Sequence, residues 1–535
     1  MFFNSLLLIL YFHLILLSLL GYGVLFCKFC KINLKEIGIG ILGLLSIFFL
    51  TFISYLTNFF FSHNTDHNLA IFIIGLLLFL IFLVKDEILI KKEIVKVLAV
   101  SYLLIIALFM SKNNEDFGYY HFAYIVNLTE NKVQFGLANF NSGFGTQSSI
   151  FYFTSLLHLP IIKYYLFNLH SLLILIFSNL FFLENFFTNK KKNNFIKILS
   201  FLAFTFVNLI FWRLAEYGTD RSGQIIVFII IITYLSNSIK NLFFQNNIKI
   251  LLILITYIIT IKSYFLIYIF LFPLIVIQIK NKIINFFFKN KNLFLILLLY
   301  LLLFFSVNIA NTGCIIYPLS FTCFPNLFWS VPLDTVIDLN HWFELWSKSG
   351  AGPNYAIEDR IGYINNFNWI SNWIKNYFFT KVSDTLLALF LISIVFIFLL
   401  KSNQIYKKKI LPKVSYLYFF LILLILIWFN KHPDLRYGGY VLIALFFFIP
   451  LTSYLCKYKF NSNFNNLKVF CIVTIIFLSF NIRNGLRILS EFNRNDVYKF
   501  YNFPFFSKEY LKTNINFNLI SESQKIMGYN FYSRR

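Results

Sequence analysis

Long apolar runs are the feature that most restricts the fold of this chain. Twelve runs of membrane-spanning length lie near residues 2–26, 38–61, 69–84, 94–110, 162–187, 195–212, 223–239, 293–309, 384–400, 414–430, 439–455 and 468–482. The run 249–279 is longer than one span needs and is interrupted at Lys262 and Ser263, so it predicts two short helices that meet at a polar break. Because 59% of the residues are hydrophobic, a soluble domain could not bury them. The sequence therefore predicts an all-α polytopic integral membrane protein with roughly 12–14 transmembrane helices.

Loop charge predicts how these helices are oriented. Alternate loops are rich in lysine, for example those near residues 189, 280 and 401, and the positive-inside rule places them in the cytoplasm. The other loops carry few Lys or Arg and are expected outside. They are the loops near 62, 213 and 430 and the break at 262. Two larger segments belong with them, a first outer loop at 111–149 and a small outer cap at 310–383. We thus expect a transmembrane domain at 1–482 and a polar tail at 483–535. The net charge of +24 follows from this topology. No nucleic-acid partner is predicted, since no basic block is interleaved with aromatics on a soluble surface.

The first outer loop holds carboxylates that are placed for chemistry. Asp116 opens a segment whose apolar spacing predicts an amphipathic helix along the membrane surface. Asp116 is either the N-cap of that helix or a catalytic base. The neighbouring Glu115, the nearby His121 and the glycine-rich stretch 136–145 favour a ligand site.

Three other outer elements carry cations. Asp220 and Arg221 lie at a span entrance, where they form either a plain interfacial pair or a phosphate site. Lys262 lies at the break and is either a site residue or a lysine that snorkels to the surface. His432, Asp434 and Arg436 share a tight turn in HPDLRYGG. Three cations beside an acidic loop predict a site for an anionic lipid head group with a carboxylate base nearby.

The cysteines predict one covalent link. Cys314 and Cys323 lie close together at the start of the outer cap, in an oxidising compartment, and are expected to form a disulfide; two unrelated buried thiols are the alternative. Cys27 and Cys30 form a single CxxC with no second pair, which favours packing over a zinc site. No metal site and no cofactor are predicted, and a divalent metal stays an open alternative.

The sequence resembles the GT-C class of membrane glycosyltransferases, and within it one branch of bacterial membrane proteins. The elements that carry the resemblance are Asp116, Tyr120–His121, Gly136–Leu137–Ala138–Asn139, Ser148–Ser149, the stretch from Glu216 to Arg221, the break at 261–262, GCIIYPLSFTCFPNLFWSVP at 313–332 and PDLRYGG at 433–439. The resemblance implies a GT-C-like fold in the bacterial inner membrane, with its active site facing the periplasm.

The same resemblance implies an enzyme of cell-surface glycan or glycolipid assembly. It would transfer a hexose or pentose from a polyprenyl-phosphate sugar to a lipid-linked glycan, a lipid or a protein. Asp116 would be the general base with Glu115 in reserve. Substrate contacts would come from His121, Asp220, Arg221, Lys262, His432 and Arg436. The alternative is a carrier, flippase or polymerase for a lipid-linked saccharide. A carrier needs charged residues in the cytoplasmic halves of its spans, and the sequence places almost none there, which favours the enzyme.

Overall fold

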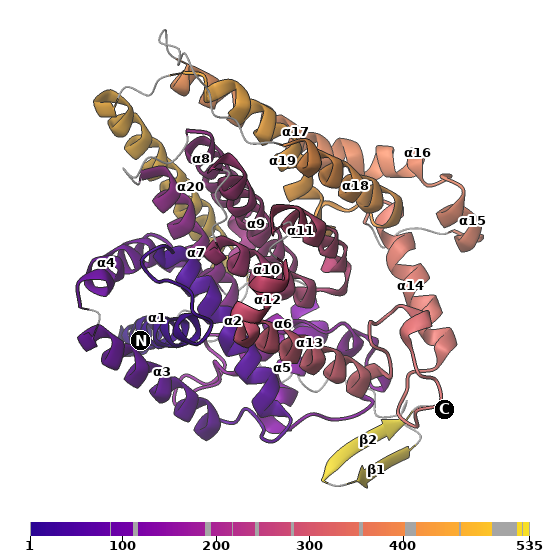
Figure 1. Ribbon diagram of the computed structural model, residues 1–535. Helices are drawn as coiled ribbons and strands as arrows, with labels where there is room; N and C mark the ends of the chain where they lie inside the picture. The colour runs from indigo at the N-terminus through magenta and orange to yellow at the C-terminus, as the bar shows by residue number, and fades with distance from the viewer. Residues whose placement is uncertain are drawn as a thin grey trace.

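The computed structural model describes residues 2–85, 87–110, 116–187, 194–216, 218–240, 245–279, 283–351, 357–401, 414–458, 462–494, 522–526 and 528–533. Within these residues the fold consists of helices and one C-terminal β-hairpin (Figure 1). The apolar runs form helices because a backbone in hydrocarbon must satisfy its hydrogen bonds within its own segment. The expectation of a helical protein is confirmed.

The N-terminal helices form a close-packed group. α1 (Phe2–Phe29) packs against α2 (Ile39–Asn58) and α3 (Thr65–Lys85), and α4 (Glu87–Leu103) leads into the short helix η1 (Ile105–Phe109). Gly21 of α1 and Gly75 of α3 lie where a Cβ on either one would strike the other helix. Small residues at such a crossing let two backbones approach, which is how helices associate where no water drives them together.

The middle of the chain supplies the helices at the centre of Figure 1. They are α7 (Leu169–Phe187), α8 (Asn194–Ile210), α9 (Asp220–Lys240), α10 (Gln245–Ile261), η6 (Ser263–Leu271), α11 (Phe272–Ile279), α12 (Ile283–Lys289) and α13 (Lys291–Thr312). The break predicted at Lys262 is confirmed. This residue is extended, with φ −156° and ψ 141°, between α10 and the 3₁₀ helix η6.

The C-terminal part adds the outer cap and the last helices. They are α14 (Leu333–Lys348), α15 (Arg360–Asn365), α16 (Ile370–Trp373), η9 (Ile374–Val382), α17 (Ser383–Leu400), α18 (Ser415–Lys431), η10 (Leu435–Tyr437), α19 (Gly439–Leu455) and α20 (Ser462–Arg494). The cap is packed: Trp369 and Trp373 are buried, and the buried ammonium of Lys348 lies 2.7 Å from Glu344 Oε1. The disulfide between Cys314 and Cys323 is confirmed.

Helix length and composition support several membrane spans. Among the described residues, seven helices are long and apolar enough to cross a membrane, or up to eight if the bent pair Ser263–Ile279 and Ile283–Lys289 counts as one span. Four shorter apolar helices are α8, α10, α18 and α19. The protein is thus a polytopic helical membrane protein, and the number of 12–14 crossings stays a prediction.

The first outer loop differs from the expected surface helix. A π-helical turn, η2 (Phe117–His121), runs into α5 (Phe122–Glu130), which packs against α6 (Ser149–Ser155). Seven of the nine residues of α5 are buried, namely all of its apolar residues together with Thr129. This helix therefore lies inside the protein. The prediction of a helix along the membrane surface is therefore wrong. The spacing of apolar residues in a sequence shows only that one face of a helix is buried. Whether the opposite face is exposed or buried depends on tertiary packing, here on the packing of α6 against α5.

The C-terminal hairpin returns to this loop. β1 (Glu522–Ile526) and β2 (Tyr529–Ser533) pair antiparallel. Phe135 bridges β2: its N–H donates to the carbonyl of Asn530 (2.8 Å), and its own carbonyl accepts from the N–H of Tyr532 (3.0 Å). Helix α20 extends to Arg494, so the tail boundary expected at residue 483 falls inside a helix.

Charged side chains do occur on the side of the bundle that we expect to be cytoplasmic. Lys249, in the first half of α10, is 3% exposed. Its Nζ donates to the carbonyls of Cys30 (3.1 Å) and Lys31 (2.7 Å) just beyond the end of α1. The sequence predicted almost no charged residues in the cytoplasmic halves of the spans, and Lys249 corrects this prediction. Because a cation at a helix C-terminus satisfies otherwise unpaired carbonyls, Lys249 has a structural explanation.

The loop charges predict which cysteines an impermeant reagent can reach in intact cells. In a Cys471→Ser background, which removes the exposed native thiol, single cysteines at the exposed positions Asn64, Asp359 and Lys431 should label. Cysteines at Lys289 and Lys401, exposed in loops expected to be cytoplasmic, should label only after permeabilisation. Protection at any of the first three positions would contradict the topology at that loop.

Candidate functional site

Lys262 and Asp220 form the first ion pair of the candidate site. Lys262 Nζ lies 2.5 Å from Asp220 Oδ1, and the two side chains are 24% and 18% exposed. Asp220 opens α9, and Lys262 follows the last residue of α10. A largely buried cation is costly unless it is paired. The ion pair explains how Lys262 is tolerated, and the side chain does not simply snorkel to the surface.

Arg436 projects from the turn between α18 and α19. Asp434 shapes this turn, because its Oδ1 accepts a hydrogen bond from the backbone N–H of Arg436 (3.0 Å) and its Oδ2 lies 3.3 Å from Nε of the same residue. Tyr377 donates a second hydrogen bond to Asp434 Oδ1 at 2.6 Å. The guanidinium of Arg436 lies over Trp346 of the cap, 4.2 Å from the ring centre.

The ring of Tyr437 brings the two cations together. Lys262 Nζ lies 4.7 Å and the guanidinium carbon of Arg436 5.0 Å from its centre. Arg436 Nη2 also donates to the Tyr437 hydroxyl (3.2 Å). Gln224 of α9 holds the turn in place, since its amide N–H donates to the carbonyl of Arg436 (2.9 Å). The start of α9, the break after α10 and the turn before α19 therefore meet at one point.

Two residues of the first outer loop, Asp116 and His121, interact electrostatically with the residues that meet here. His121 interacts electrostatically with Asp116, Lys262, Asp220 and Arg436, and Arg436 in turn with Asp116 and Asp220. Burial is the main cause that lowers the pKa of His121 to about 4, so its imidazole is neutral at pH 7. We call these five residues the charged cluster.

The side chain of Asp116 does not cap the helix that follows it. This residue precedes η2 and makes no side-chain capping hydrogen bond. The alternative reading of Asp116 as a simple N-cap therefore lacks its defining contact. Glu115, the expected reserve base, lies outside the described residues.

His432 lies beside the charged cluster, but its side chain makes a hydrogen bond with the outer cap. Its Nδ1 is 3.0 Å from the Ser347 hydroxyl, and its ring meets that of Tyr264 edge-on at 5.1 Å. Burial, followed by the charge of Lys431, lowers the pKa of His432 to about 3. A neutral imidazole held by α14 positions the turn, and we expect no proton transfer from it.

Arg221 is the third predicted cation. Its electrostatic partners are, in decreasing order of effect, Tyr440, Arg213, Glu216 and Asp220. Consecutive helical residues point about 100° apart, so Asp220 and Arg221 cannot both face Lys262. The structure thus brings together two of the three predicted cations.

Sequence reasoning missed several residues that build the cluster. Gln224 had a signal, since it is a lone amide at the start of the apolar run 223–239. Asp434 was recognised in the tight turn, but its hydrogen bond from the Tyr377 hydroxyl was not predicted. Tyr437 lies in the PDLRYGG element but was not singled out, and Trp346 carried no signal, because aromatic residues are abundant throughout this chain. Within the described residues, no group of three or more His, Cys, Asp or Glu side chains is arranged to hold a metal ion.

The fold and the cluster define a class: a multi-pass helical membrane protein with a charged site where loops and helix ends meet. The chain belongs to the family described as domain of unknown function (DUF8201), whose model matches residues 6–443. The matched region contains all five residues of the charged cluster. No curated protein and no solved structure matches the chain.

Proposed function

We propose that this protein is a GT-C-type glycosyltransferase of the bacterial inner membrane. It would use a polyprenyl-phosphate-linked sugar at the outer face, in cell-surface glycan or glycolipid assembly. The observation that carries the proposal is the charged cluster: Lys262 and Arg436 lie over one ring, within electrostatic reach of the carboxylate of Asp116. Glycosyl transfer from a lipid phosphate needs both a base for the acceptor and cations for the leaving group.

In the proposed reaction, Asp116 accepts the proton of the acceptor hydroxyl. The hydroxyl oxygen then bonds to the anomeric carbon of the sugar, while the bond from that carbon to the phosphate oxygen breaks. The phosphodiester carries one negative charge and the departing polyprenyl phosphate carries up to two. Lys262 and Arg436 would stabilise the charge that develops on the leaving phosphate.

The partners of these cations tune the interaction. Asp220 and Asp434 already neutralise much of the positive charge, so the phosphodiester of the donor must share the cations with them. Arg436 Nη2 donates to the Tyr437 hydroxyl, whereas its buried Nε lies 3.3 Å from Asp434 Oδ2 without a hydrogen-bond partner among the described residues, so the guanidinium has donor capacity left for a phosphate. An interaction that strengthens as the phosphate gains charge favours the transition state over the bound donor.

The proposal is tested with the purified full-length protein and synthetic polyprenyl-phosphate sugars, alongside lipid-linked sugars and surface glycans from cells with and without the gene. We expect sugar transfer in vitro, and in cells without the gene an accumulated donor and a glycan that lacks one sugar. In proteoliposomes, movement of the intact lipid-linked sugar across the bilayer without any transfer would identify a carrier instead. Unchanged glycans together with no transfer would reject the enzyme.

A further inference from the structure

The C-terminal hairpin, at the edge of the molecule in Figure 1, is fastened to the first outer loop by its second strand. The ring of Phe531 stacks on that of Phe135, with the ring centres 4.3 Å apart, and meets Trp329 of the outer cap at 5.2 Å. The side-chain amide of Asn139 donates to the carbonyls of Tyr532 (3.1 Å) and Trp329 (3.0 Å). One amide group thus joins three segments of the chain: the first outer loop, the outer cap and β2.

Gly136 allows the two backbones to approach. Its φ is +79°, and a Cβ at this position would clash with the carbonyl oxygen of Tyr532. Further along the hairpin, the Tyr529 hydroxyl donates to the carbonyl of Phe59, just beyond the end of α2 (2.8 Å), and the ammonium of Lys132 lies 3.9 Å from the Tyr529 ring centre. Because an isolated two-stranded hairpin is at best marginally stable in water, β1 and β2 depend on these contacts.

Two short helices continue from this attachment toward the charged cluster. They are η3 (Leu137–Asn139), which contacts β2, and η4 (Ser142–Gly145), which contacts both η3 and η2. Asn141 links η4 to η2, because its Oδ1 accepts from the N–H of Gly143 (2.8 Å) and its Nδ2 donates to the carbonyl of Tyr119 (3.3 Å). The contacts therefore run from β2 through η3 and η4 to η2.

The turn η2 carries one residue of the charged cluster and borders another. It begins directly after Asp116 and ends at His121. A single π-helical turn has little stability of its own, so its position depends on its neighbours. Tyr120, within this turn, packs so closely on Gly143 that a Cβ there would strike the tyrosine ring, and its side chain makes a hydrogen bond with that of Thr146. The placement of η4 therefore decides where Asp116 and His121 lie.

We propose that the C-terminal hairpin positions Asp116 and His121 at the charged cluster, with Phe531 and Asn139 as the positioning residues that fasten the first outer loop. The expected effect on sugar transfer rests on the proposed function, whereas the expected ordering of the loop does not. A loosened loop should lower kcat, because fewer molecules hold the base in place. The KM for the donor should stay the same, because Lys262 and Arg436 lie on other elements.

Hydrogen–deuterium exchange of the detergent-purified full chain tests the ordering of the loop without a substrate. Phe531→Ala should raise exchange of the amides at 117–121 roughly tenfold, as well as that next to Phe135, since a lost aromatic pair makes local opening more frequent by about that factor. Asn139→Asp, which loses both donated hydrogen bonds, should act in the same direction. Phe531→Tyr keeps the stacked ring and should exchange as the wild type does.

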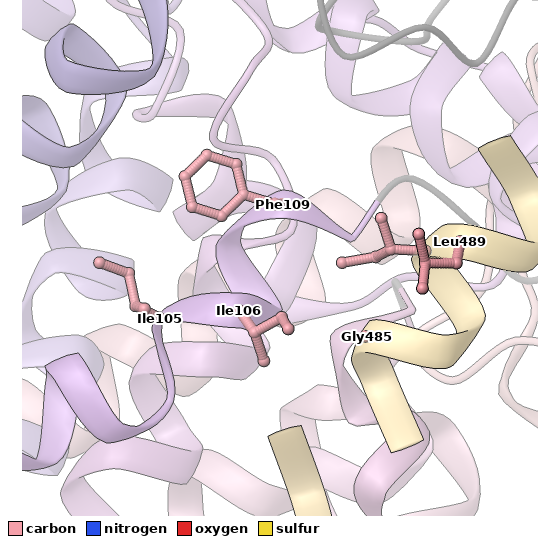
Figure 2. A pocket seen from close by; sticks show the side chains of 6 residues that line it. Ile105, Ile106, Phe109, Gly485 and Leu489 are labelled. Atoms are coloured by element: carbon pink, nitrogen blue, oxygen red, sulfur yellow. The ribbon is translucent and has the colours of Figure 1, made fainter. Parts of the chain in front are cut away.

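Two exposed side chains provide matched controls. Ile526→Ala shortens a side chain of β1, and Leu489→Ala shortens one of α20 that borders an apolar groove between η1 and α20 (Figure 2). Both variants should exchange as the wild type does. In transfer assays, Phe531→Ala should lower kcat roughly tenfold at unchanged KM, in proportion to the opening of the loop, and Phe531→Tyr should restore it.

Several results would overturn the proposal. Faster exchange confined to the amides next to Phe135 would show that the hairpin orders only its own contact site. The same rise in the core helix α9 in both Phe531→Ala and Asn139→Asp would reflect a loss of global stability. Faster exchange at 117–121 with an unchanged kcat would separate the loop from the chemistry. If the wild type transfers no sugar but Phe531→Ala still exchanges faster at 117–121, the proposed enzyme fails and the ordering of the loop by the hairpin stands.

Discussion

Asp116→Asn should lower sugar transfer by roughly 10²–10⁴-fold while the protein remains folded. An amide cannot accept the proton of the acceptor hydroxyl, which is the step assigned to Asp116. The amide keeps the size of the side chain, and the aspartate makes no capping hydrogen bond that folding would lose. The measurement is the rate of transfer from a synthetic polyprenyl-phosphate sugar, with the thermal unfolding midpoint recorded for each variant.

Three further variants make this experiment decisive. Asp66→Asn, at an exposed position in the first turn of α3, is the matched control and should transfer normally. Asp116→Ala should be as inactive as Asp116→Asn; if Asp116 served only as a cap, the alanine variant would instead lose about 1 kcal/mol of stability and keep its activity. Normal transfer by Asp116→Asn with loss in Glu115→Gln would move the base one residue back. Normal transfer in both would remove the first outer loop from the chemistry.

Arg436→Ala should reduce turnover by about 10²–10³-fold, as for the loss of one donor to a developing oxyanion. Folding should survive, because Asp434 keeps its hydrogen bonds from the Tyr377 hydroxyl and from the backbone of residue 436. Arg436→Lys should recover only part of the rate, since an ammonium group neither stacks on Trp346 as a guanidinium does nor binds phosphate in bidentate fashion.

Two controls separate this role from general electrostatics. Arg360→Ala removes an exposed arginine of the cap and should leave the rate unchanged. Arg221→Ala should have a smaller effect than Arg436→Ala, because the charges that act most strongly on Arg221 are Arg213 and Glu216, which lie outside the charged cluster. Full recovery by Arg436→Lys, or equal losses in Arg221→Ala and Arg436→Ala, would contradict a specific phosphate contact at Arg436.

The sequence by itself determined the features that depend on local composition. Apolar runs predicted helices because hydrocarbon leaves the backbone no other partner. Lys262 predicted the break after α10, since a charge inside an apolar helix is costly. Cys314 and Cys323 predicted their own disulfide, because only eight residues lie between them in a loop that is expected outside.

Only the tertiary structure decided which polar groups share a site. Arg221 and Asp220 are neighbours in sequence, but consecutive helical residues point about 100° apart; Asp220 pairs with Lys262, whereas Tyr440, Arg213 and Glu216 have the largest electrostatic effects on Arg221. The ring of Tyr437 contacts two cations, its neighbour Arg436 and the distant Lys262, and only the tertiary structure brings Lys262 to it. Strand β2 of the C-terminal hairpin pairs with Phe135, which is more than half of the chain away in sequence. Such contacts depend on packing between segments far apart in sequence, and the spacing of residues within one segment carries no record of them.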